Sequence, residues 1–100
     1  MTKVEVSPGV CGFTTQITAE QNADGQVEVK LESDCDRIQA YAESLETIDP
    51  ITALYAPDAG QELACPGCHR VCLVPVVVLK AVEAEAGLAL KMDGGFRFLD

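Results

Sequence analysis

The residues best suited to chemistry lie in one short stretch, residues 65–72, which reads Cys-Pro-Gly-Cys-His-Arg-Val-Cys. Its thiols follow the spacing Cys-x2-Cys-x3-Cys, and the Pro-Gly pair favours a turn that points the first two sulfur atoms the same way. Thiolates in such an arrangement hold zinc in structural sites and iron in iron–sulfur clusters. The stretch therefore predicts a metal centre with Cys65, Cys68 and Cys72 as ligands.

A complete centre needs a fourth donor, because structural zinc and cubane clusters are each held by four ligands. Cys35 and Cys11, which open a predicted helix and a predicted strand, are the candidates. His69 is predicted as a solvated residue or a hydrogen-bond donor to the centre, with direct coordination as the alternative. The thiolates do not separate zinc from an iron–sulfur cluster, since they serve both. Packing of the thiols as small apolar side chains is the competing interpretation.

Two other function classes stay open beside a non-enzymatic metal-binding module. A thiol–disulfide redox protein could use the same cysteine cluster, although a polar loop, rather than a strand, precedes the motif. The other class is a homodimeric interaction module without metal, whose copies join through strand edges or through the apolar helix around Val76–Val78. A nucleophile pair of Cys68 with His69 is disfavoured, because working pairs meet through the fold and not as sequence neighbours.

The composition narrows the partners and the compartment. The chain has 100 residues, 48% of them apolar, and is expected to form one domain over residues 1–100. Its net charge is −9 and its 7 basic residues are scattered singly, so neither nucleic acid nor an anionic membrane is expected as a partner. The start of the chain has no signal-peptide core, and an odd count of 5 cysteines disfavours a secreted disulfide framework. A soluble, cytoplasmic protein is the expectation.

The elements that must position the thiols begin with strands. Residues 1–8 are predicted as a frayed or edge lead-in to the first strand. Residues 10–19 are predicted as a strand, because Cys11, Phe13 and the next alternate positions fall on one face. An Asp-Gly pair marks a hairpin turn, and residues 27–32 alternate as the partner strand.

Helices follow, predicted at about residues 34–47, 49–56 and 71–86. Ser33 and Asp49 are suited to cap the first two, and Cys35 lies on the inward face of the first. Pro75 fits only the first turn of the third helix, and Gly87 its end. The positive end of a helix dipole favours thiolate over thiol, so the start of the third helix suits the cysteine cluster and the start of the first helix suits Cys35.

The end of the chain is predicted as a short strand or hairpin, with residues 88–92 and 96–99 on either side of an Asp-Gly-Gly turn. The expected fold is therefore α+β: an N-terminal antiparallel β-hairpin packed on two or three helices, closed by the short C-terminal strand or hairpin.

The cysteines and the predicted elements follow a recognisable order. The order is a cysteine in Gly-Val-Cys-Gly-Phe at residues 9–13, a hairpin, Cys35 at a helix start, and a late cysteine group before the last helix. The layout, over roughly residues 10–86, resembles the TSCPD domain, a small module thought to bind metal through cysteines. The resemblance implies Cys11, Cys35, Cys65 and Cys68 as ligands. The literal Thr-Ser-Cys-Pro-Asp string is absent, and Glu-Ser-Asp replaces the glycine-rich stretch before Cys35. The chain is also similar in style to small uncharacterised cysteine-rich proteins of anaerobic microbes.

Overall fold

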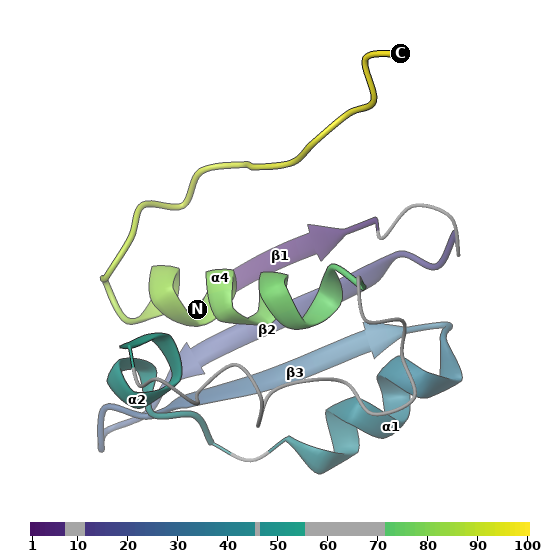
Figure 1. Ribbon diagram of the computed structural model, residues 1–100. Coiled ribbons are helices and arrows are strands. Elements are labelled where there is room, and N and C mark those ends of the chain that lie inside the picture. The colour runs from purple at the N-terminus through teal and green to yellow at the C-terminus, as the bar shows by residue number, and fades with distance from the viewer. Residues whose placement is uncertain (8–11, 46, 56–71) are drawn as a thin grey trace.

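The structure, a computed structural model, describes residues 1–7, 12–45, 47–55 and 72–100. In these ranges a three-stranded antiparallel sheet precedes three helices (Figure 1). The elements are β1 (Thr2–Val6), β2 (Thr15–Gln21), β3 (Val27–Ser33), α1 (Asp36–Ser44), α2 (Pro50–Tyr55) and α4 (Val74–Glu85). The predicted α+β class is confirmed, with one strand more than the predicted hairpin.

The sheet has the order β1-β2-β3, and each neighbouring pair is antiparallel. Its register aligns Val6 with Thr15 and Thr15 with Ser33, so β1 and β3 finish at the same end of the sheet. Along β2 the side chains of Thr15, Ile17 and Ala19 are buried, as the two-residue period requires, and the alternate positions face outward. The sheet therefore has one face for the core and one for solvent.

The hairpin turn between β2 and β3 forms as predicted. The side-chain oxygen Oδ1 of Asn22 accepts hydrogen bonds from the backbone N–H groups of Asp24 at 2.9 Å and Gln26 at 3.1 Å. Gly25 has φ of 81°, in the left-handed region that a residue without Cβ adopts at little cost. The turn thus fixes the register of the strands that lead to Cys35.

Helix α4 covers the inner face of the sheet (Figure 1). It begins at the end where β1 and β3 finish and runs back to the end where they start. Val74, Val78 and Val82 are fully buried on it and pack with Ile17 in one core cluster. Each buried aliphatic side chain stabilises the fold by roughly 1.5–3 kcal/mol, so this contact fixes the start of α4 firmly on the sheet.

The helix ends follow the predicted signals closely. Asp49 Oδ1 accepts hydrogen bonds from the N–H groups of Ile51 at 3.0 Å and Thr52 at 3.2 Å, which caps α2. Helix α4 has proline in its first turn and Gly87, at φ of 76°, just past its end. The start of α1 differs, because Cys35 and not Ser33 is the N-cap residue.

Two strand predictions need correction. Residues 2–6 are no lead-in but the edge strand β1, with Thr2 and Val6 buried on the core face. The strand predicted at residues 10–19 begins only at Thr15, and Phe13 is 41% exposed instead of inward. Gly12, at φ of 72°, takes a conformation that does not continue a strand.

The predicted C-terminal strand or hairpin is not found, since residues 88–100 contain no strand. The alternating pattern there is real, but a strand needs a neighbour for its backbone hydrogen bonds. Figure 1 shows this segment leaving α4 and running away from the sheet. Within the described ranges, no helix combines the length and the apolarity that a membrane crossing requires.

Candidate metal centre

Cys35 stands where β3 passes into α1. It is the N-cap residue of α1, is half-buried and packs against the core. Its backbone N–H donates to Ser33 Oγ at 3.1 Å, and its own side chain makes no capping hydrogen bond to the helix. The first N–H groups of a helix have no partner within the helix. Cys35 therefore lies at a positive helix end that can stabilise an anion.

Cys72 lies near the start of α4, one residue before its N-cap residue Leu73. It is half-buried against the core, and the N-cap residue of α4, Leu73, makes no side-chain capping hydrogen bond. Helices α1 and α4 both begin at the end of the sheet where β3 finishes (Figure 1). Two helix starts, each beside a cysteine that is in no disulfide, thus share one end of the molecule.

Tyr41, on α1, interacts electrostatically with Cys72, which lies before α4. Its side chain is buried in the core on α1. Burial, and secondarily the charge of the Cys72 thiolate, raises the pKa of Tyr41 to about 12. The phenol of α1 and the thiol before α4 are therefore close enough to interact electrostatically. The sequence analysis missed Tyr41, although its spacing of three residues from the buried Ile38 is a helical signal.

Thr15 contributes a second feature at this end of the sheet. It is fully buried where β2 begins, and its hydroxyl has no hydrogen-bond partner in the part of the chain that the structure describes. Buried hydroxyl groups nearly always have a partner. We call the end of the sheet near Cys35 and Cys72 the thiol end. The core there holds a hydroxyl group, that of Thr15, which the described part of the chain leaves without a hydrogen-bond partner.

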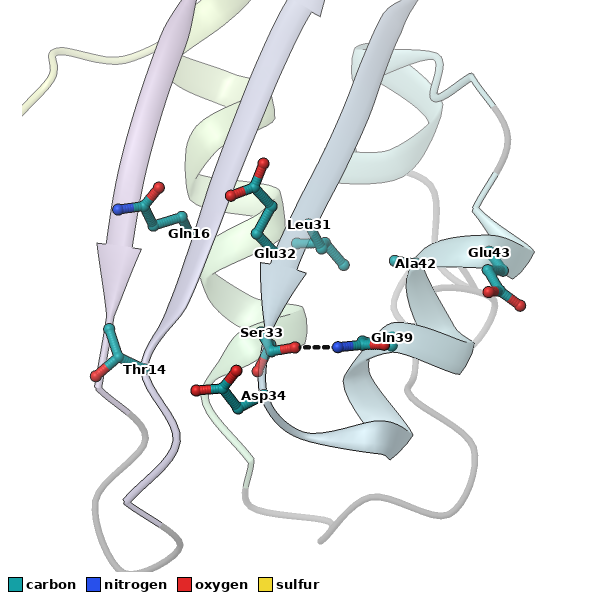
Figure 2. A pocket seen from close by; sticks show the side chains of 9 residues that line it. All are labelled: Thr14, Gln16, Leu31, Glu32, Ser33, Asp34, Gln39, Ala42 and Glu43. Atoms are coloured by element: carbon teal, nitrogen blue, oxygen red, sulfur yellow. Dashed lines mark hydrogen bonds between the residues drawn. The ribbon is translucent and has the colours of Figure 1, made fainter.

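An open groove of about 660 Å³ lies over the junction of β3 and α1. Figure 2 shows Glu32 and Asp34 on the β3 side and Glu43 on α1, with the Gln39 side-chain amide donating a hydrogen bond to the Ser33 carbonyl. The carboxylates give the surface beside Cys35 a negative charge, which attracts cations in general. This groove was not predicted, because its residues come from separate elements.

The other predicted site residues, Cys11, Cys65, Cys68 and His69, lie outside the described residues. Among the residues that are described, no three or more His, Cys, Asp or Glu side chains are placed to hold a metal ion. The ligand set therefore stays a prediction, and what the structure adds is the position of Cys35 and Cys72.

The chain belongs to DUF6951, a family of unknown function, whose sequence profile matches residues 2–98. No curated protein and no solved structure matches the chain. This match gives no support to the resemblance to the TSCPD domain, and it agrees with the broader expectation of an uncharacterised family.

Proposed function

We propose that the protein is a small, non-enzymatic metal-binding module whose thiolates hold zinc or an iron–sulfur cluster. Cys65, Cys68 and Cys72 are the principal ligands of this proposal, and Cys35 and Cys11 are the next donors. His69 serves the centre as a ligand or as a hydrogen-bond donor. The metal ion is the partner of the protein in this proposal, and the same cluster would perform dithiol chemistry only if the metal is absent.

The observation that carries the proposal is the shared position of Cys35 and Cys72. Both are half-buried and both stand at the start of a helix, and the N-cap residue of neither helix makes a side-chain capping hydrogen bond. A thiolate-bound zinc or iron–sulfur centre carries negative charge, which the positive ends of α1 and α4 stabilise. A pair of ordinary core cysteines would need no such position.

The sequence connects further thiols to this end of the sheet. Cys68 precedes Cys72 by four residues in the same cysteine motif. Cys11 is covalently joined to Gly12, in the connection between Val6 and Thr15, which pair at the same end of the sheet. The net charge of −9 adds a general attraction for cations.

The proposal is tested on full-length protein purified without oxygen, by elemental analysis and visible absorption. We expect about one equivalent of zinc, or iron with the visible bands of an iron–sulfur centre. Cys68→Ala and Cys72→Ala should each lose most of the metal, whereas Ala40→Ser, at an exposed position of α1, should keep it. A circular dichroism spectrum establishes that each variant is folded.

Less than about a third of an equivalent of either metal in the wild type would reject the proposal. In that case, a disulfide that forms and reduces reversibly between two of the three clustered cysteines would favour the redox alternative instead.

A further inference from the structure

The last segment of the chain, residues 88–99, exposes an unusual amount of apolar surface; we call it the tail. Six large side chains of the tail are exposed: Leu88 by 40%, Leu90 by 82%, Met92 by 78%, Phe96 by 68%, Phe98 by 86% and Leu99 by 85%. The rings of Phe96 and Phe98 meet edge to face, with centroids 6.1 Å apart. Contiguous exposed apolar surface of this kind marks an interaction site.

The tail has the sequence pattern of strands. Leu88, Leu90 and Met92 alternate with smaller or polar residues, and Phe96 and Phe98 alternate again after the Asp-Gly-Gly turn. A period of two residues suits a strand that packs one face on a core. An isolated strand or hairpin is not stable in water, so the pattern is fulfilled only when the tail joins a sheet.

A sheet edge is open for it. On its inner side β1 pairs with β2, and within the described ranges no strand pairs with its outer side. The edge of β3, in contrast, is engaged at its first residue by the bridge from Val27 to Ile48. An open edge presents unpaired backbone N–H and C=O groups to any strand of suitable pattern. In a strand added there, Leu88, Leu90 or Met92 would lie beside the partly buried Val4 on the core face of the sheet.

The position of the tail favours the β1 edge of another copy over its own. Glu85, at the end of α4, accepts hydrogen bonds from Thr2 and Gln21, so the tail departs beside the start of β1. Pairing with its own β1 from that point would be parallel, and the tail instead runs away from the sheet (Figure 1). Antiparallel pairs are the more stable and more common kind, and a copy related by a two-fold axis can supply one.

Charge and area agree with this occupant. The tail and Asp100 carry two basic residues, Lys91 and Arg97, and two acidic residues, Asp93 and Asp100, so the net charge of −9 resides entirely in residues 1–87. The tail is therefore the segment that an acidic second copy repels least, and Lys91 can approach Glu5 of β1. Each tail has six large apolar side chains, and each of these can bury about 100–200 Å². Two tails together therefore bury on the order of 1,500 Å², which is the size of a standard stable interface.

We propose that the protein forms a two-fold dimer in which the tail of each copy folds as a hairpin of residues 88–92 and 96–99, and its strand 88–92 pairs with the open edge of the five-residue β1 of the other copy. Sedimentation velocity of the full-length protein should show a dimer in the micromolar range. Leu90→Glu and Phe98→Glu should each raise the dimer dissociation constant at least about tenfold, because each places a charge in an apolar contact. Ile51→Glu, at a side chain of α2 that is 57% exposed, should leave the dimer unchanged.

A photoreactive amino acid at position 90, in a mixture of isotopically heavy and light protein, identifies the acceptor. We expect cross-links between heavy and light copies that fall on residues 2–6. A wild-type monomer at all concentrations overturns the proposal, as do cross-links only within one copy or a dimer that both tail variants leave intact. None of these outcomes bears on the metal content, so this dimer and the proposed metal centre are tested separately.

Discussion

At the end of the sheet where β1 starts, Glu85 accepts hydrogen bonds from Thr2 Oγ1 at 2.8 Å and from the Gln21 N–H at 2.9 Å, and lies 3.4 Å from the amino terminus. At the opposite end the N-cap residues of α1 and α4, Cys35 and Leu73, make no side-chain capping hydrogen bond. The Thr15 hydroxyl there has no partner within the described ranges. One carboxylate thus joins three elements at the first end, whereas at the second end the described residues leave the Thr15 hydroxyl unsatisfied.

This difference agrees with the proposed position of the metal centre. At one end the Glu85 carboxylate pairs with Thr2, Gln21 and the amino terminus. The thiol end has two positive helix starts and two half-buried cysteines, which suit an anionic centre built of thiolates.

Metal removal should act through the thiol end and should have the largest effect. A strong chelator is expected to lower the free energy of unfolding by on the order of 5 kcal/mol, because metal binding to a folded site is coupled to folding. Denaturant titrations with and without chelator measure the change. Glu85→Gln, a change at the other end, should keep this dependence on metal, and identical midpoints with and without chelator would contradict the account.

Replacing Thr15 tests whether its hydroxyl is truly without a partner. Thr15→Val keeps the shape and removes the hydroxyl, and burial of an unsatisfied hydroxyl costs about 1–3 kcal/mol. The variant should therefore unfold at higher denaturant concentration, by about 1 kcal/mol in metal-free protein. Thr18→Val, on the outer face of the same strand, is the matched control. Destabilisation by Thr15→Val would mean that the hydroxyl has a partner after all.

Tyr41 reports the distance between α1 and the start of α4. Its pKa is raised to about 12 by burial and by Cys72, so the stability it contributes is complete below about pH 10 and is lost as the pH rises towards 12. Cys72→Ala should lower this pKa while burial keeps it above the ordinary value. Absorbance titration in a Tyr55→Phe background, where one tyrosine remains, measures it. Cys35→Ala should cause no change, and an equal effect of both replacements would remove the evidence for the contact.

The smallest effect is expected at Glu85. Hydrogen bonds from the Gln21 N–H and from Thr2, together with the amino terminus, lower the pKa of Glu85. Its stabilisation is therefore present above the ordinary carboxyl pKa and is lost as the pH falls through the lowered value. At neutral pH the wild type should have a higher unfolding midpoint than Glu85→Gln. The difference between the two midpoints should disappear as the pH is lowered. A gap independent of pH, or an equal one for Glu28→Gln on the open face of the sheet, would argue against this role.

Local signals predicted much of the fold. The strand at residues 27–32, the Asp-Gly turn, the Asp49 cap and the limits of α4 were all predicted from side chains that act within a few residues of themselves. The strand β1 was missed because its short alternation gains meaning only beside β2. The C-terminal strand was predicted in error because a sequence pattern does not say whether a partner strand is present.

The candidate site was predictable only in part. The spacing of residues 65–72 indicates ligands, and the helix signals placed Cys35 and Cys72 at helix starts. That these two starts lie at one end of the sheet depends on the direction of α4 across it, which no local pattern encodes. The closeness of Tyr41 to Cys72 likewise joins residues from separate elements.

X-ray absorption at the metal edge of anaerobically purified protein tests the central claim most directly, because it counts the sulfur atoms bound to the metal. The account predicts three or four sulfur neighbours at about 2.3 Å, and a loss of one on Cys72→Ser but none on Ala40→Ser. A shell of oxygen and nitrogen alone, or a sulfur count that Cys72→Ser leaves unchanged, would contradict it.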